Sequence, residues 1–272
     1  FILKYKYLEG FKNRNIDFDI SGTSRSKIQF SEKTIESYLF DSSNFDPEIE
    51  NKLKNVTHIL ISTPPEVEQV IIKNYLTTLR NNKNLQWVGY LSSTSVYGDH
   101  KGDWVEETSN LQPTSEMGLK RMEAEQLLLN SNLPVRIFRL AGIYSLERNI
   151  FSRLKKKEVK IINKKDQIFS RIHVEDIAQV LFSSFSKSKN KDIFNVSDDV
   201  PCSYKEVVQY AAALLQVEMP KKINFEDLEN SKMKDFYRDR KKVQNSKIKS
   251  MGVKLKYPTF KEGLTAIFNQ IS

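Results

Sequence analysis

The sequence predicts an α/β protein with a doubly wound parallel sheet, followed by a smaller, mainly helical C-terminal lobe. Short β-rich runs alternate with longer segments of helical periodicity, which is typical of βαβ units. The chain has 272 residues, enough for one large domain or two modest ones. Its 39% hydrophobic and 28% charged content is that of an ordinary globular protein and excludes a disordered chain.

The predicted elements alternate along the first two thirds of the chain. The strands are FDISG near Phe18, YLFD near Leu39, HILIS from His58, QWVGYLS from Gln86, PVRIFRL from Pro134 and DIFNVS from Asp192. Helical periodicity covers Glu66 to Arg80, Ser115 to Asn130 and Glu175 to Ser186. Because parallel strands need crossover connections, each helix is expected to pack against a face of the sheet.

The pattern changes after about residue 145, where charged helices and short connections follow. Capping-box spacings at Ser203 to Glu206 and at Thr259 to Glu262 indicate two helix starts. We therefore assign residues 1–145 to a first domain, and 146–171 with 199–272 to a substrate lobe. Residues 172–198 hold a helix and the last strand, and are expected to return to the sheet.

Composition restricts the function classes. The single cysteine, Cys202, excludes an internal disulfide and a multi-cysteine zinc site, and the three histidines lack metal-ligand spacing. No apolar stretch reaches about 18 residues, so we expect neither a membrane span nor a secretory signal, and predict a cytoplasmic protein. The net charge of +9 favours anionic partners. We expect a small-molecule substrate, and leave nucleic acid and homo-oligomers as alternatives.

Polar side chains follow the predicted strands. In an open parallel sheet, ligands bind outside the carboxyl ends of the strands. The residues at these positions are Thr23, Ser24, Arg25, Asp41, Ser62, Thr63, Ser92, Ser93, Thr94 and Ser95. Hydroxyls and a guanidinium suit phosphate and ribose groups, although Ser and Thr at such positions also cap helices.

Five motifs in order resemble the extended short-chain dehydrogenase/reductase superfamily, in its NAD-dependent epimerase/dehydratase branch. They are LSSTSVYG from Leu91, RLAGIYS from Arg139, RIHVEDIA from Arg171, FNVSDD from Phe194 and the closing NSKIKSMGVKLKYPTFKEGL from Asn245. The resemblance spans nearly the whole chain. It implies a Rossmann cofactor domain and a C-terminal lobe that closes over a nucleotide-sugar or another small substrate.

The resemblance implies roles for matching residues. Ser93 stands where the family keeps the hydroxyl that hydrogen-bonds the reacting oxygen, Asp41 where an acid faces the adenine, and Thr63 beside the cofactor ribose. Arg25 stands where a basic residue meets a ribose 2′-phosphate, so NADP is expected as cofactor, with NAD as the alternative. Thr23 and Ser62 join this cofactor set, whereas Thr94, Arg148 and Arg171 are expected to contact substrate.

The glycine loop departs from the family pattern. The nine glycines contain no GxG pair, so the usual pyrophosphate cradle is absent from this sequence. Residues 1–10 read either as the first strand and loop with Lys4, Lys6 and Glu9 at glycine positions, or as part of the first helix. We favour the helix, with the strand and loop preceding Phe1, and expect the 272-residue chain to bind a dinucleotide poorly.

The catalytic pair departs as well. Relatives carry a Tyr and a Lys four residues apart on one helix, and alignment on Glu123 to Glu125 places Met117 and Arg121 there. A thioether cannot transfer a proton, and an arginine stays charged, although Arg121 remains a candidate for holding a phosphate or ribose. A one-residue shift pairs Glu116 with Lys120 and still supplies no tyrosine. Tyr97 is the candidate replacement acid.

Two functions remain at this point. The first is an NADP-binding, epimerase-like or oxidoreductase-like protein that acts on a nucleotide-sugar-like molecule, with Ser93 and Tyr97 as catalytic candidates. The second is a catalytically silent, nucleotide-binding sensor or scaffold, with RNA as an alternative partner. Lysines clustered with exposed aromatics would favour RNA, and a cleft lined by Ser93, Thr63 and Arg121 would favour a small ligand.

Overall fold

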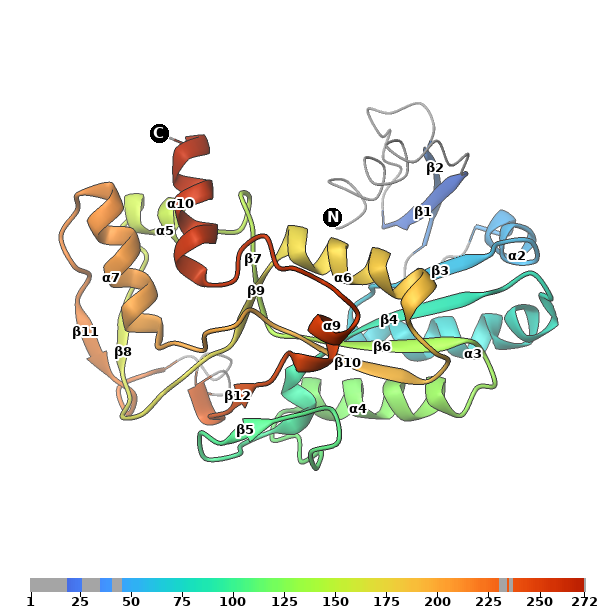
Figure 1. Ribbon diagram of the computed structural model, residues 1–272, viewed down its shortest axis with the longest axis horizontal. Helices are drawn as coiled ribbons and strands as arrows, with labels where there is room; N and C mark the ends of the chain where they lie inside the picture. Colours follow the sequence, from blue (N-terminus) through green and yellow to red (C-terminus); the bar gives the residue numbers. More distant parts are fainter. Residues whose placement is uncertain (1–18, 26–34, 41–45, 230–233, 235–236, 272) are drawn as a thin grey trace.

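A four-stranded parallel sheet forms the centre of the molecule in the computed structural model, which describes residues 19–25, 35–40, 46–229, 234 and 237–271 (Figure 1). Its strand order is β10-β6-β4-β3. The bounds are β3 His58–Ile61, β4 Trp87–Ser93, β6 Val135–Leu140 and β10 Asp192–Val196. All of β6 and nearly all of β4 are buried, as expected for central parallel strands, although β6 carries two arginines and β4 ends in two serines.

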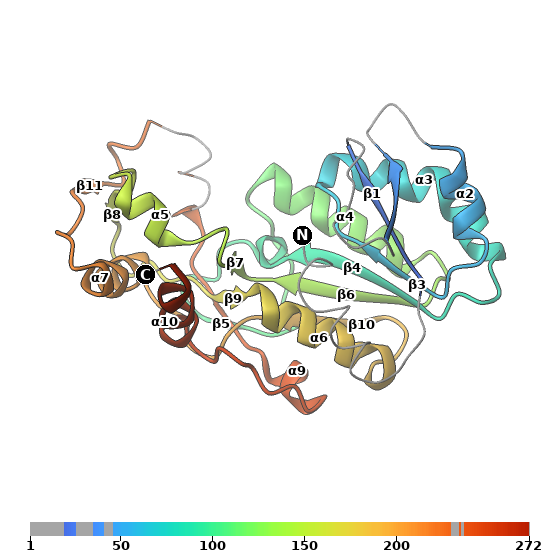
Figure 2. The ribbon, with the colours of Figure 1, turned by 90° about the horizontal axis from the view of Figure 1, so that it is seen from above.

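Helices cover both faces of this sheet. Figure 2 shows α3 (Pro65–Asn81) and α4 (Glu116–Leu129) on one side, and α6 (Val174–Lys187) on the other. The Ser115 side chain accepts a hydrogen bond from the Gly118 amide and begins α4. The doubly wound fold is therefore confirmed, with its three predicted helices. No helix in the described ranges is long and apolar enough to cross a membrane.

The first strands lie apart from the central sheet. β1 (Ile20–Ser24) and β2 (Ile35–Leu39) pair in parallel with each other, and α2 (Glu48–Leu53) follows them. Lys52 of α2 forms ion pairs with Asp19 and Glu36, at 3.0 and 2.7 Å. Residues 1–18, on which both interpretations of the N-terminus depend, lie outside the described residues, as does Asp41.

The C-terminal lobe has its own apolar core, around Phe151, Val208 and Leu264. Its elements are α5 (Ile150–Lys155), β8 (Ile161–Asn163), α7 (Tyr204–Leu215), β11 (Lys222–Asn224) and α10 (Phe260–Ile271). The Ser203 and Glu206 capping box is present, and the Thr259 amide donates to the Glu262 carboxylate as that spacing predicts. The parallel pair of β8 and β11 is an addition that sequence periodicity did not reveal, because each strand has three residues.

Short parallel pairs join the two parts of the chain. β7 (Gly142–Tyr144) pairs with β9 (Arg171–His173), and β5 (Trp104–Val105) pairs with β12 (Lys242–Val243). The 3₁₀ helix η2 (Thr94–Tyr97) continues β4, and α9 (Ser246–Ser250) packs near β10. Segments that are distant in sequence therefore meet at the carboxyl ends of the central strands.

A buried ion pair lies beneath this edge. Arg139 of β6 donates from Nε and from one terminal nitrogen to the Glu125 carboxylate of α4, with a shortest distance of 2.8 Å. Both side chains are at most 3% exposed. The other guanidinium nitrogen donates to the Tyr97 hydroxyl at 2.9 Å and to the Glu107 carbonyl at 3.1 Å. Ser92 donates to Glu125 at 2.5 Å, so β4, β6, α4 and η2 share one network.

A second buried carboxylate lies at the end of β10. Asp198 is 1% exposed, and neither of its carboxylate oxygens has a hydrogen-bond partner among the residues that the structure describes. Burial raises the pKa of Asp198 to about 8, although the nearby Arg171 guanidinium opposes this shift. The buried Tyr144 hydroxyl likewise lacks a partner within the described ranges. Asp198 is thus expected to hold a proton near neutral pH.

Replacing Arg139 by Met should lower the free energy of unfolding by about 3–5 kcal/mol, because the Glu125 carboxylate would remain buried without its partner. Urea denaturation measures this change. The double variant Glu125→Leu, Arg139→Met should be more stable than Arg139→Met alone. A double variant that is as unstable as the single one would contradict the ion-pair explanation.

Wild-type stability should fall as pH rises from 6 to 8, by about 2 kcal/mol from Asp198 alone. The pKa of this group in the folded state, about 8, exceeds its ordinary value of 3.8, so its stabilising contribution is complete below pH 3.8 and is lost as pH rises through 8. Because a carboxamide does not ionise, Asp198→Asn should flatten the profile when urea denaturation is repeated at each pH. An unchanged slope would contradict the assignment.

Candidate functional site

The carboxyl end of β4 presents the predicted hydroxyl. The half-buried Ser93 side chain accepts a hydrogen bond from the Ser95 amide at 3.1 Å and begins η2, so it has the capping role that the sequence left open. Its hydroxyl proton remains available for a second bond. Thr94 is half-buried beside it. A side chain at Gly118 of α4 would lie 2.8 Å from the Ser95 carbonyl oxygen, so α4 and η2 approach closely here.

Tyr97 does not have the surroundings of a replacement acid. Its side chain is fully buried, donates to the Asn195 side-chain oxygen at 2.7 Å and accepts from Arg139. Burial raises the pKa of Tyr97 to about 12, because the charged phenolate would be poorly solvated. This geometry is typical of a structural tyrosine and does not favour the predicted proton transfer.

Arg121 joins the ends of two strands. It donates to the Leu91 carbonyl at 2.7 Å, to the Tyr90 hydroxyl at 3.2 Å and to the Thr63 carbonyl at 3.4 Å. The Thr63 hydroxyl is buried and has no hydrogen-bond partner among the described residues. The predicted proximity of Thr63 and Arg121 is therefore present, and Arg121 fixes the loop after β3.

The beginning of α4 carries the positions aligned with the family pair. Met117 is 49% exposed. Glu116 and Lys120, the residues paired when the alignment is shifted by one position, form a salt bridge at 2.6 Å on the surface of α4. The predicted cofactor residues Thr23, Arg25 and Ser62 are exposed at the ends of β1 and β3.

The two predicted substrate arginines differ in position. Arg148 is exposed in a turn in which its amide donates to the Ser145 hydroxyl. Arg171 is half-buried and donates to the carbonyls of Phe169 and Cys202, and to the Cys202 sulfur. One guanidinium nitrogen of Arg171 is therefore engaged in holding the lobe together. Burial raises the pKa of Cys202 to about 11, which opposes a nucleophilic role.

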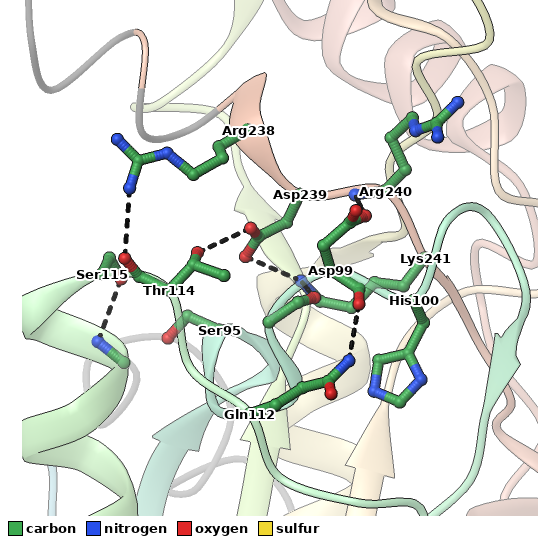
Figure 3. Close-up of polar contacts among 12 residues, drawn as sticks. Ser95, Asp99, His100, Gln112, Thr114, Ser115, Arg238, Asp239, Arg240 and Lys241 are labelled. Atoms are coloured by element: carbon green, nitrogen blue, oxygen red, sulfur yellow. Dashed lines mark hydrogen bonds and ion pairs between the residues drawn. The ribbon is translucent and has the colours of Figure 1, made fainter.

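A segment of the C-terminal lobe crosses onto the β4 end; we call residues 237–242 the strap. Figure 3 shows Arg238 and Asp239 directed toward Thr114, just before α4. The Lys241 amine donates to the Gly98 carbonyl at 2.9 Å, and the Arg240 amide donates to the Asp99 carboxylate at 2.8 Å. The strap is thus attached to both η2 and the start of α4.

A hollow of about 240 Å³ lies beside the strap in the C-terminal lobe. Its polar lining includes Lys164, Lys205, Lys222, Tyr204, Tyr237, Asn163, Asp166, Gln167 and Ser203. The Lys164 amine donates to the carbonyls of Tyr237 and Arg238. The pKa of Lys164 is lowered, first by burial and then by the positive charge of Arg240. The surroundings of this hollow therefore favour an anion.

Sequence reasoning did not assign Thr114, Asp239 or Lys241 to a site. Thr114 precedes a helix and Asp239 stands among basic residues, and nothing in the sequence near either residue indicates that the two are in contact. Over the ranges that the structure describes, no group of His, Cys, Asp and Glu side chains is arranged to hold a metal ion.

Comparisons with known proteins agree with this architecture. The family model described as RmlD substrate binding domain matches residues 76–272. A functionally unknown conserved protein from Silicibacter pomeroyi DSS is 38% identical, with 92% of this chain and 90% of that chain covered and a TM-score of 0.81. No match was found among curated proteins.

Two more distant solved structures share the fold. A dTDP-glucose 4,6-dehydratase from Bacillus anthracis str. Ames, in complex with NAD, is 16% identical, with coverage of 99% of this chain and 92% of that chain and a TM-score of 0.80. A UDP-glucuronic acid 4-epimerase from Bacillus cereus, in complex with UDP-4-deoxy-4-fluoro-glucuronic acid and NAD, is 15% identical, with coverage of 100% and 96% and a TM-score of 0.78. The family model matches well over half of the sequence. The chain therefore belongs to the RmlD substrate-binding-domain family.

Proposed function

We propose that the protein binds NAD or NADP at the carboxyl edge of its sheet and a nucleotide-sugar-like molecule between that edge and the C-terminal lobe. The observation that carries this proposal is the hollow beside the strap, where Lys164, Lys205 and Lys222 meet Tyr204 and Tyr237. Lysines complement phosphates, and aromatic rings offer apolar surface to a base or sugar. The relatives solved with sugar nucleotides support this substrate class.

Residues that follow β3 and β1 would contact the ribose groups of a dinucleotide. The buried Thr63 hydroxyl has no partner among the described residues, so a ribose hydroxyl would satisfy it. Thr23 and Arg25 are exposed at the end of β1, where the ribose 2′ group is expected. A bound nicotinamide would supply hydride transfer. Ser93 would orient the reacting hydroxyl or carbonyl of the substrate.

A second candidate function is a catalytically silent nucleotide-binding sensor. The observation that favours it concerns Met117 and Tyr97, the two residues at positions where a proton donor is expected. Met117 carries no transferable proton, and the Tyr97 hydroxyl is buried with its pKa raised to about 12. Positioned proton transfer typically contributes about 10² to 10⁴ in rate, so we expect any turnover to be slow.

Lys164→Met should weaken binding of UDP-glucose by about tenfold or more, because a charge-assisted hydrogen bond is worth roughly 1.5–3 kcal/mol. Calorimetry on the full natural chain measures the affinity, and chromatography of the recovered nucleotide sugar with NAD present distinguishes an enzyme from a sensor. The neighbouring Lys165→Met is the matched control, because Lys165 is exposed and does not line the hollow. Equal losses for both variants would contradict the proposed site.

Arg25→Ala should weaken NADP binding by about tenfold and leave NAD binding nearly unchanged, because an exposed guanidinium gains most from the 2′-phosphate. Fluorescence titration of both reduced cofactors measures the ratio. A wild-type preference for NAD would overturn the proposed preference for NADP. Equal losses for both cofactors would show that Arg25 acts on the fold of this region.

A further inference from the structure

We propose that Asp239 is a positioning residue that pins the strap to the start of α4 and thereby holds Tyr237 and Gln167 in the wall of the hollow, where the ligand binds. The proposal rests on the proposed nucleotide-binding function. The Asp239 side chain points toward Thr114 (Figure 3) and does not line the hollow, so it would act through its neighbours rather than by touching the ligand.

Asp239 receives hydrogen bonds from three segments of the chain. One carboxylate oxygen accepts from the Thr114 hydroxyl at 2.6 Å, and the other faces the Lys241 amine at 3.5 Å. Its carbonyl accepts from the Gln167 side-chain amide at 2.8 Å. Thr114 precedes α4, and Gln167 follows β8. A single residue therefore joins the first domain, the strap and the wall of the hollow.

Thr114 also contacts Arg238. The Arg238 guanidinium donates to the Thr114 carbonyl at 3.2 Å, while the Thr114 hydroxyl donates to Asp239. Arg238 is exposed, and an exposed guanidinium loses little energy by turning into solvent. The bond between Asp239 and Thr114 fixes the adjacent backbone, which limits the positions that Arg238 can take.

The charge around the strap explains why this residue is an acid. Lys164, Arg238, Arg240 and Lys241 bring four positive charges together, against the carboxylates of Asp99 and Asp239. The Lys241 side chain is only 13% exposed, and burial lowers the pKa of Lys241 whereas Asp239 opposes that shift. Removing the Asp239 charge would leave a buried ammonium group beside an excess of positive charge, which favours separation of the strap from η2.

The test compares Asp239→Asn, Thr114→Val and their double variant with Glu158→Gln, an exposed acid of the same lobe that does not line the hollow, as control. UDP is the probe, and calorimetry measures its affinity. Each single variant should weaken UDP binding about fivefold or more, and the double variant should lose no more than the weaker-binding single one, because both substitutions break the same hydrogen bond. Glu158→Gln should not weaken UDP binding. Additive losses in the double variant would overturn the proposal.

Amide hydrogen exchange separates this proposal from the proposed function. The Arg240 and Lys242 amides donate to Asp99 and to the Asp103 carbonyl, so their exchange reports attachment of the strap. Thr114→Val should accelerate both at least about tenfold without UDP present. Unchanged exchange would show that the Thr114 hydroxyl does not hold the strap in place, and would overturn the proposal whether or not UDP binds. Faster exchange with unchanged UDP affinity would show a structural contact only and overturn the positioning role. If wild-type protein does not bind UDP, the proposed function fails and the hollow has no ligand to receive. The positioning role then fails with it, even where exchange shows that the strap is attached through Thr114.

Discussion

The buried ion pair between Arg139 and Glu125 is the interaction on which the rest of the site depends. A guanidinium and a carboxylate that are both at most 3% exposed persist only when each is fully paired. Arg139 meets this condition by bonding to Glu125, Tyr97 and the Glu107 carbonyl. Since successive side chains of a strand point to opposite faces, Ser92 enters this network and Ser93 faces the other way. The position of the candidate catalytic hydroxyl thus follows from a charge beneath it.

Periodicity explains why the main strands and helices could be predicted. The strands β3, β4, β6 and β10 are short segments rich in apolar residues, and α3, α4 and α6 lie between them in the chain as crossover helices. The contacts of the site are different, because they are not local. Thr114 and Asp239 are 125 positions apart, and no sequence pattern near either residue predicts their contact. Tyr97 illustrates the same limit, since its hydroxyl is chemically suitable as an acid and only the fold reveals that it is buried.

Resemblance between folds does not extend automatically to chemistry. The B. anthracis dehydratase and the B. cereus epimerase superpose well at 16% and 15% identity, which shows a shared architecture. The S. pomeroyi protein is 38% identical and is itself functionally unknown. At its β4 end this chain has an exposed methionine in the first turn of α4 and an arginine that holds two strand ends together.

The path of the strap has a consequence for the order in which the protein acquires its shape during synthesis. The loop after η2 is held by partners 141 and 143 positions later in the chain, at Arg240 and Lys241. A ribosome adds roughly 5–20 residues per second, so this loop emerges many seconds before its partners exist. The central strands have by then been made, whereas β5 still lacks β12. The nascent chain therefore passes through a stage in which the central strands have been made but the strap has not. The late-made residues both finish the fold and complete the wall of the hollow, to which Tyr237 belongs.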